Sequence, residues 1–474
     1  MPLILPGNVA SAIGGGYEVD NSLRFEAANG DYIRRENTGT DFSASGSKLF
    51  TYSVWVKRAK LGSFQQIYAI GSGAGRDYTA FDSSDRIEFA QVNSGVQYQL
   101  TTTRVFRDIS AWYHLVFAVD TTNGTANNRL RLYVNGTEET VFTTRTNPSS
   151  SLAILANTQC DSYVLGADTD YNNDFSGYFS EVCYVSGSQE TATPFGEFDE
   201  DSPTIWKPKK ITATLASDSF YYEFKNSGAV GTDTSGLGNT AGTINGLTAA
   251  DQATDTPTNN FCTMNPLDNF YYDATFSEGN LKLAQPSDTE CYTTSTIAVS
   301  SGKWYWEIKI TSSGSDRDFV GIADKVSTAS DFTPFSGNSN MLSYYGYTGD
   351  SKAGSTGTSY GDTFTTGDII GVAMDLDNNK LYFSKNGTFQ DSGDPTSGAT
   401  GTGALSINAS PADGVWYAQF ANIHNTASTF EANFGNPTFT ISSGNADDNG
   451  YGNFEYDVPS GYYALCTKNL AEYG

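Results

Sequence analysis

The sequence is short of basic residues and of long apolar runs. It has 27 lysines and arginines against 53 aspartates and glutamates, a formal net charge of −26 over 474 residues. A protein that binds a polyanion needs a concentrated basic patch. The clearest basic cluster here is only Lys207, Lys209 and Lys210, and Pro208 interrupts it. Because the basic residues are so few and scattered, we expect no nucleic-acid partner. No run of about 18 apolar residues occurs, so we also expect no membrane insertion.

Cysteine and histidine are also scarce. The five cysteines form no CxxC pair, and because their number is odd and their density low, a disulfide scaffold is not expected. Cys160 and Cys183 could pair if their strands are adjacent; the alternative is that all five are small buried residues. The histidines, His114 and His424, are too few and too far apart for a histidine-rich metal site.

The N-terminus lacks the positively charged start of a signal peptide. If the protein acts outside the cell, it must therefore leave by another route, such as lysis. Residues 1–16 are rich in proline, glycine and small residues, with one apolar patch at Leu3, Ile4 and Leu5. We interpret them as an extended arm whose apolar patch anchors the protein to a larger particle.

Aromatic residues are abundant, with 29 tyrosines and 29 phenylalanines, and they suit pleated strands joined by tight turns. Charged residues make up only 17%, which excludes a coiled coil. In residues 52–57, Val54 and Val56 alternate with Trp55 and predict a strand with two different faces. Residues 113–120 and 130–134 predict two further strands, and Asn135-Gly136 predicts a hairpin turn.

A second strand-rich block begins near residue 265. In residues 302–310, Trp304, Trp306, Ile308 and Ile310 share one predicted strand face. Asn386-Gly387 repeats the hairpin signal of the first block. We predict an all-β chain with two jelly-roll or β-sandwich domains, an extended N-terminal arm and a short connector that contains some β structure. The expected boundaries are an arm at 1–16, a sandwich at 17–200, the connector at 201–264, a sandwich at 265–440 and a C-terminal extension at 441–474.

Both blocks resemble known domain families. The first resembles a LamG-like, concanavalin A-type domain, on the strings SVWVK (53–57), WYHLVFAVD (112–120), RLYVNG (131–136) and GYFSEVCYV (177–185). The second resembles a SPRY domain, on GKWYWEIKI (302–310), VGIA (320–323), GDIIGVAMDLDNNKLYFSKNG (367–387) and ANFG (432–435).

The whole arrangement is similar to fibre or appendage proteins of marine tailed phages. The similar strings are MPLILPGNVASA (1–12), DTPTNNFCTMNPL (255–267) and VPSGYYALCTKNL (458–470). The resemblance implies a virion protein that serves attachment or display and is not an enzyme. It also implies a homotrimer whose partners are other virion proteins, reached through the arm, and a host surface glycan or protein. A capsid decoration protein without a receptor remains an alternative.

A polysaccharide-degrading glycanase is the other alternative, because the concanavalin A-type fold also hosts such enzymes. They place carboxylates at alternate positions of one strand. The nearest match is Glu197, Asp199 and Asp201, which could instead be a solvated acidic run ahead of Pro203.

Calcium is the one cofactor that the sequence suggests. Asp168, Asp170, Asn172 and Asp174 offer oxygen ligands at alternate positions. An EF-hand is excluded, because Asn173 stands where its loop requires glycine. A looser calcium loop and a hydrophilic turn are both compatible with the pattern.

One loop is predicted to bind a ligand. Tyr344, Tyr345, Tyr347 and Asp350 combine aromatic contact area with a carboxylate, as adaptable binding loops and sugar sites do. The alternative is a strand end that packs on the core.

Overall fold

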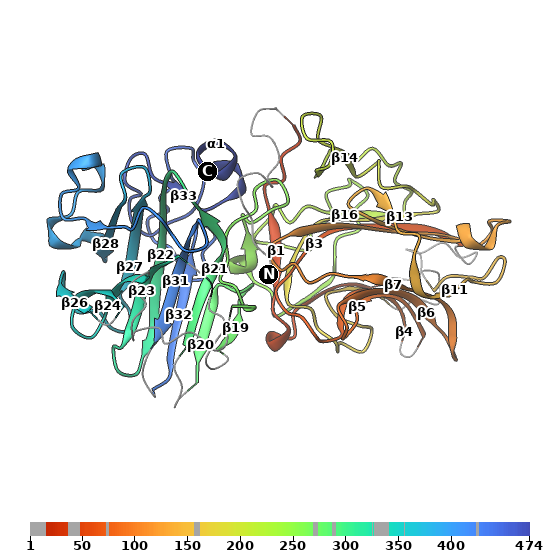
Figure 1. Cartoon of the computed structure of the whole chain (residues 1–474). Helices are drawn as coiled ribbons and strands as arrows, with labels where there is room; N and C mark the ends of the chain where they lie inside the picture. Colours follow the sequence, from red (N-terminus) through yellow and green to blue (C-terminus); the bar gives the residue numbers. More distant parts are fainter. Residues whose placement is uncertain are drawn as a thin grey trace. The chain divides into compact units, whose positions relative to one another are not determined.

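The described residues divide into two compact units, a first unit that ends at Thr258 and a second unit of Asn259–Gly474. The computed structural model describes residues 16–36, 48–72, 75–155, 162–268, 274–286, 291–324, 326, 341–354, 356–422 and 426–474. Strands make up nearly all of the regular structure in both units (Figure 1). The predicted all-β fold class, with jelly-roll-like domains, is confirmed.

The first unit contains two large antiparallel sheets. One has the order β10 (Thr137–Glu138), β9 (Leu130–Val134), β8 (Trp112–Asp120), β3 (Leu49–Arg58), β13 (Gly177–Ser186), β1 (Ser22–Phe25) and β18 (Gln252–Ala253), with β16 (Phe220–Tyr222) also paired to β13. The other has the order β11 (Phe142–Thr146), β7 (Val96–Val105), β6 (Arg86–Val92), β5 (Gly75–Phe81), β4 (Gln65–Ser72), β12 (Ser162–Leu165), β2 (Tyr32–Glu36) and β17 (Thr243–Asn245). A small hairpin joins β14 (Gly196–Phe198) to β15 (Trp206–Pro208).

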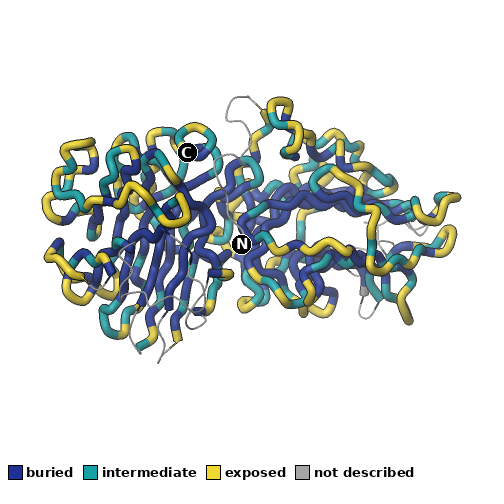
Figure 2. The backbone as a smooth tube through the Cα atoms, viewed as in Figure 1, coloured by how far each residue is buried: buried dark blue, intermediate teal, exposed yellow. Residues whose placement is uncertain are grey.

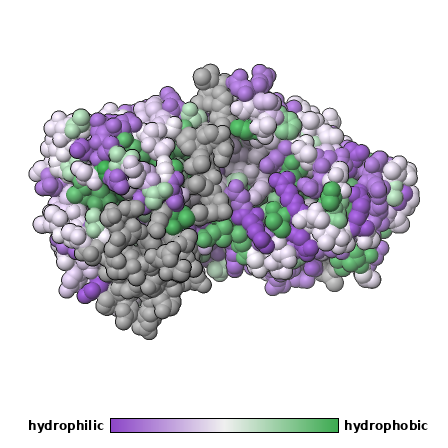
Figure 3. Space-filling model, viewed as in Figure 1, coloured by the Kyte–Doolittle hydropathy of each residue, from purple (hydrophilic) through white to green (hydrophobic). Residues whose placement is uncertain are grey.

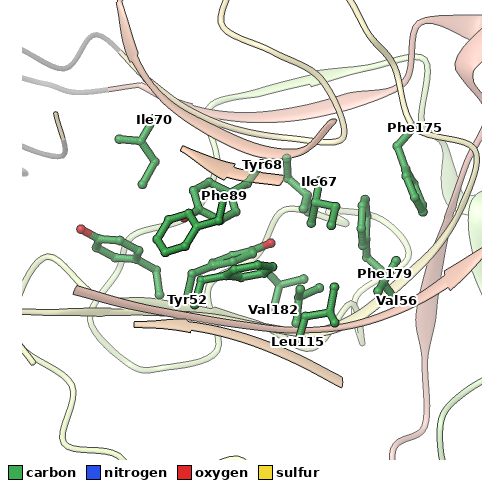
Figure 4. Close-up of a cluster of buried hydrophobic side chains, with 14 of the residues drawn as sticks. Tyr52, Val56, Ile67, Tyr68, Ile70, Phe89, Leu115, Phe175, Phe179 and Val182 are labelled. Carbon is green, nitrogen blue, oxygen red and sulfur yellow. The ribbon is translucent and has the colours of Figure 1, made fainter. Parts of the chain in front are cut away.

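The core of the first unit lies between its two large sheets. Side chains from both sheets meet there, among them Tyr52 and Val56 of β3 and Ile67 and Tyr68 of β4 (Figure 4). Trp55 points to the opposite face of β3 and joins a second buried cluster. The alternation predicted for residues 52–57 is therefore confirmed.

Residues 201–258, which we expected to form most of a connector, belong to the first unit. Their short strands β16, β17 and β18 pair with β13, β2 and β1. Asp255, fully buried, accepts from the Lys57 ammonium at 2.6 Å and from the Trp112 indole at 3.0 Å. Val19 N–H donates to Thr258 Oγ1 at 3.1 Å, so the unit begins and ends at neighbouring positions. Strands of two or three residues are too short to show a hydrophobic period, which is why the sequence resembles a loop there.

The second unit also has two sheets. One has the order β19 (Thr275–Ser277), β20 (Lys282–Gln285), β32 (Ser428–Asn433), β22 (Lys303–Ser313), β27 (Ile369–Asp375), β28 (Lys380–Lys385) and β29 (Thr388–Phe389); β30 (Leu405–Ser406) pairs with β28, and β33 (Tyr463–Ala464) with β22. The other has the order β21 (Cys291–Val299), β31 (Trp416–Asn422), β23 (Asp318–Ala323), β24 (Met341–Tyr345), β25 (Asp350–Ala353) and β26 (Thr356–Ser359).

The core of the second unit contains the four side chains predicted to share one face of β22, namely Trp304, Trp306, Ile308 and Ile310. The opposite face of β22 carries Tyr305, which clusters with Phe454 and Tyr462 of the C-terminal segment. Residues 441–474, expected to be an extension, thus complete this unit. They contain β33 and the helix α1 (Thr467–Tyr473).

Both predicted hairpin turns have the same backbone conformation and the same side-chain hydrogen bond. Asn135 and Asn386 have φ angles of 46° and 47°, and the glycines that follow them also have positive φ angles. Asn135 Oδ1 accepts the backbone N–H of His114 at 2.8 Å, and Asn386 Oδ1 accepts that of Ile369 at 2.9 Å. The side chain thus stabilises the turn that its backbone forms.

Burial follows the strands in both units, and exposed residues concentrate in the connections (Figure 2). In the view of Figure 3, hydrophobic residues form only small patches on the described surface. No helix among the described residues is long and apolar enough to cross a membrane.

Candidate ligand-binding surface

The predicted calcium loop forms a hydrogen-bonded turn. Asp168 Oδ1 accepts the backbone N–H groups of Asp170 and Asn172 at 2.9 and 3.0 Å, and Oδ2 accepts the Asn173 amide at 2.8 Å. Burial, followed by the charge of Asp168, raises the pKa of Asp174. Within the described ranges, no group of three histidine, cysteine or acidic side chains is placed to hold a metal. The Asp168 carboxylate thus stabilises the turn, and calcium binding by this loop stays a prediction.

The middle residue of the acidic trio, Asp199, is held by structural hydrogen bonds. Asp199 accepts from the backbone N–H groups of Asp201 and Ser202 and, at 3.1 Å, from the Lys207 ammonium. Burial acts to raise the pKa of Asp199, but these donors outweigh it and lower the pKa. Glu197 is exposed on β14. The geometry therefore assigns Asp199 to the β14–β15 hairpin, not to acid chemistry.

His114 and Ser53 are close but cannot act as a nucleophile pair. The Trp206 indole, which can only donate, bonds to His114 Nδ1 at 2.9 Å. The ring proton therefore lies on Nε2, which donates to Ser53 Oγ at 2.8 Å and cannot accept its proton. Burial lowers the pKa of His114 to about 3, so the ring is neutral. His114 is therefore a buried core histidine whose two ring nitrogens both form hydrogen bonds.

The predicted tyrosine loop is divided between two faces of a sheet. Tyr344 is fully buried in the core, and its hydroxyl donates to the Asp362 carbonyl. Tyr345 points the other way and stacks on Phe319 with ring centroids 4.2 Å apart. Tyr347, beyond the strand, is 53% exposed. Tyr344 is thus a core residue and not a binding residue, because β24 continues through Tyr345 and consecutive strand residues alternate in direction.

The other three predicted residues adjoin two cations. We call Arg317, Tyr345, Tyr347, Asp350 and Lys352 the cation–tyrosine patch. The Arg317 guanidinium lies 4.9 Å from the Tyr347 ring centroid, and the Lys352 ammonium lies 5.5 Å from that of Tyr345. The two tyrosine rings are 6.2 Å apart, and Lys352 also pairs with Asp350 at 3.4 Å. Such cation–π contacts are each worth roughly 0.5–1 kcal/mol at exposed sites.

Glycines shape this patch. Gly349 has φ +73°, and a Cβ there would lie 2.1 Å from the Gly361 carbonyl oxygen. A Cβ at Gly357, on the neighbouring strand β26, would lie 2.2 Å from Lys352 Nζ. Gly349 therefore allows the tight turn after Tyr347, and Gly357 leaves the space that Lys352 occupies.

The patch combines positive charge with aromatic faces in a strongly acidic chain. A ligand that carries a carboxylate on an apolar ring or chain matches both properties. Sequence reasoning found the tyrosines but missed Arg317 and Lys352. No local motif joins Arg317 to Tyr347, because the pairing of β23 with β24 brings them together.

Two predicted features, the apolar patch of the arm and the possible cysteine pair, involve residues outside the described ranges. Leu3, Ile4 and Leu5 lie outside the described residues, as does Cys160. Cys183 is a buried free thiol. The anchoring role of the arm therefore stays a prediction.

Family models match one segment in each unit. The model for the concanavalin A-like lectin/glucanases superfamily matches residues 27–187, and the SPRY domain model matches residues 303–414. The chain carries a concanavalin A-like domain followed by a SPRY domain. The candidate patch lies on the SPRY domain.

Known proteins are similar to part of this chain. Ran-binding protein 9 of Danio rerio is 34% identical over 130 residues, which cover 26% of this chain and 21% of that protein. Ran-binding protein 10 of Danio rerio is 37% identical over 95 residues, 20% of this chain and 16% of that protein. The chain thus spans about a fifth or less of these relatives.

Solved structures also resemble parts of the chain. The SPRY domain of human HERC1 matches with a TM-score of 0.29 and 18% identity, covering 36% of this chain and 96% of that one. A SAP-like pentraxin of Limulus polyphemus matches with a TM-score of 0.27 and 13% identity, covering 36% and 78%.

Proposed function

We propose that the chain is a non-enzymatic attachment subunit of a phage virion, in a tail or head fibre. The SPRY domain binds carboxylate-bearing glycan on the host surface through the cation–tyrosine patch. Residues 1–16 join the subunit to other virion proteins, and a homotrimer presents several copies of the patch. Weak contacts then add up across copies, as multivalent binding requires.

The cation–tyrosine patch is the observation that carries this proposal. Arg317 and Lys352 gather on aromatic faces in a chain of net charge −26, which favours an acidic ligand over a neutral or basic one at this place. The polar groups that could have suggested catalysis, such as His114 and Asp199, are engaged in structural hydrogen bonds. Ran-binding protein 9 is named for binding Ran, which supports a binding role for a similar module.

Binding to immobilised acidic polysaccharide tests the proposal. The purified chain should bind polygalacturonate and host cells, bind neutral dextran poorly, and lose affinity as salt rises. The double variant Arg317→Ala/Lys352→Ala should bind both at least tenfold more weakly. The variant Lys60→Ala/Lys210→Ala removes the same charge from exposed positions of the other domain and should bind normally. Equal binding by both variants would refute a role for the patch.

The virion part of the proposal has its own test. A chain that lacks residues 1–16 should fold but should not enter the particle. Electron microscopy of labelled particles should place the intact protein on a fibre. Full incorporation without the arm, or a label spread over the capsid surface, would contradict this part.

A further inference from the structure

A pocket of about 420 Å³ lies in the SPRY domain, outside the cation–tyrosine patch. Its walls are the turn around Gly387 and Phe389, the segment Asp394–Thr396 that begins the 3₁₀ helix η6 (Pro395–Thr400), and residues 456–459. We call it the C-terminal pocket, because residues 456–459 close one side of it. Its size is within the range of roughly 300–1,000 Å³ typical of small-molecule sites.

Buried hydrogen bonds hold the wall that contains Tyr456. The Glu307 carboxylate, fully buried on β22, accepts the backbone N–H groups of Glu455 and Tyr456 at 3.0 and 2.9 Å. It also accepts from the Tyr305 hydroxyl and the Asn433 amide. An acid in the middle of a core strand therefore positions the segment that carries the Tyr456 ring.

The opposite walls are equally well defined. The Tyr462 hydroxyl donates to the Pro395 carbonyl at 3.0 Å, which ties η6 to the C-terminal segment. A Cβ on Gly387 would lie 2.6 Å from the Tyr456 ring, so the glycine allows the ring to lie against the turn. The pocket is thus built from three segments that buried contacts hold in place.

The lining chemistry is aromatic and acidic. Tyr456, Phe389 and the prolines supply ring faces, and Asp394 and Asp457 supply exposed carboxylates. Asp394 uses Oδ1 to accept the backbone N–H and the hydroxyl of Thr396, at 2.9 and 2.6 Å. None of the lining residues, all of which are described, is basic.

We propose that the C-terminal pocket binds a neutral saccharide unit. Sugar hydroxyls donate hydrogen bonds, which carboxylates accept, and the C–H face of a sugar ring packs on aromatic rings. The two carboxylates repel acidic sugars, so this ligand differs in charge from the one expected at the cation–tyrosine patch. The two sites do not depend on each other, and either could exist without the other.

Saturation-transfer NMR and calorimetry on the full chain test the proposal, with methyl glycosides of glucose, galactose and N-acetylglucosamine as probes. At least one glycoside should bind saturably. Asp457→Ala and Tyr456→Ala should each weaken that binding at least tenfold. Both changes leave the backbone bonds to Glu307 in place, and thermal unfolding checks that each variant is folded.

Two controls separate this site from the rest of the molecule. Asp170→Ala removes an exposed acid from the other domain, and Arg317→Ala/Lys352→Ala removes the cations of the patch; both variants should bind glycoside normally. If the unaltered chain binds glycoside but binds neither polygalacturonate nor host cells, the proposed function alone is refuted. The pocket proposal is overturned if no glycoside binds, if choline binds instead, or if Asp457→Ala and Asp170→Ala behave alike.

Discussion

Glu181 lies in a bulge of β13, where the pairing with β3 shifts between Ser180 and Cys183. Its φ is +51°, a backbone conformation that residues other than glycine adopt infrequently. Its carboxylate accepts from the hydroxyls of Tyr17, at 3.0 Å, and Tyr221. Burial raises the pKa of Glu181 to about 7, although the two hydroxyl donors act to lower it. This single carboxyl therefore titrates near neutral pH.

Glu181 should make the first unit more stable in mild acid than at neutral pH. Its pKa is about 7 when folded and near 4.5 when unfolded, so the folded state binds more protons between these values. The stabilisation is complete below about pH 4.5 and is lost as the pH rises through 7. Glu181→Gln keeps an acceptor for both tyrosines but cannot titrate. Urea unfolding from pH 4.5 to 8 should show the wild type losing stability relative to this variant.

An exposed carboxylate provides the control for that experiment. Glu197→Gln removes an exposed charge from β14 and leaves Glu181 in place, so the stability of this variant should change with pH as that of the wild type does. If the Glu181→Gln curve is also parallel, the carboxyl does not titrate in this range.

His114 should behave in the opposite way. Its pKa falls from 6.5 to about 3 because burial disfavours the charged ring. The unfolded state then binds more protons, so this residue weakens the fold as the pH drops below 6.5. In NMR titrations, the ring shifts of His114 should stay constant from pH 8 to 4.5 in folded protein and should titrate near 6.5 in urea. A midpoint above pH 5 in folded protein would contradict the buried, neutral ring.

At the scale of elements, the Asn-Gly hairpins join backbone preference to side-chain bonding. Besides the bond to Ile369, the Asn386 amide donates to Asp368 Oδ1 at 2.7 Å. One residue thus connects the turn to the start of β27.

Asn386→Ala should destabilise the second unit by about 2–3 kcal/mol. It loses the bond to the Ile369 N–H, worth roughly 1 kcal/mol, and places alanine in a left-handed conformation that costs about 1–2 kcal/mol. Asn386→Gly loses the same bonds without the steric cost, so it should be the milder change. Urea unfolding of both variants measures the difference. Equal losses would show that left-handed strain contributes nothing.

The same scale shows what the sequence can and cannot predict. The faces of β3 and β22 follow from alternation, because every second residue of a long strand meets the same environment. The strand β16, with three residues, offers no period to detect. Pairing between strands that are far apart in the chain leaves no local sequence pattern, so the sequence does not predict the contact between Arg317 and Tyr347. Tyr344 was misplaced because a strand end and a binding loop have the same composition.

For the whole molecule, the boundary of the first unit decides which pieces can fold. A fragment of residues 13–258 should unfold cooperatively. A fragment ending at residue 200 should not, because it lacks β16, β17 and β18 and leaves Lys57 buried without Asp255. Removing one partner of a buried ion pair costs about 3–5 kcal/mol. Circular dichroism and urea titration of both fragments check this.

A point variant separates the ion pair from the missing strands. Asp255→Asn in the fragment 13–258 keeps every strand, so it should fold with reduced stability. If the fragment ending at residue 200 is as stable as the longer one, residues 201–258 are a linker after all.

The hydrogen bond from Val19 to Thr258, together with the pairing of Ser22 with Ala253, places the entry and exit of the first unit side by side. A module whose two ends are adjacent can be inserted into a surface loop of an unrelated protein without moving the two ends of that loop apart. The segment that encodes this module can therefore be transferred between genes as a single unit. Joining its two ends with a few residues and opening the chain elsewhere should likewise give a circular permutant with the same sheets.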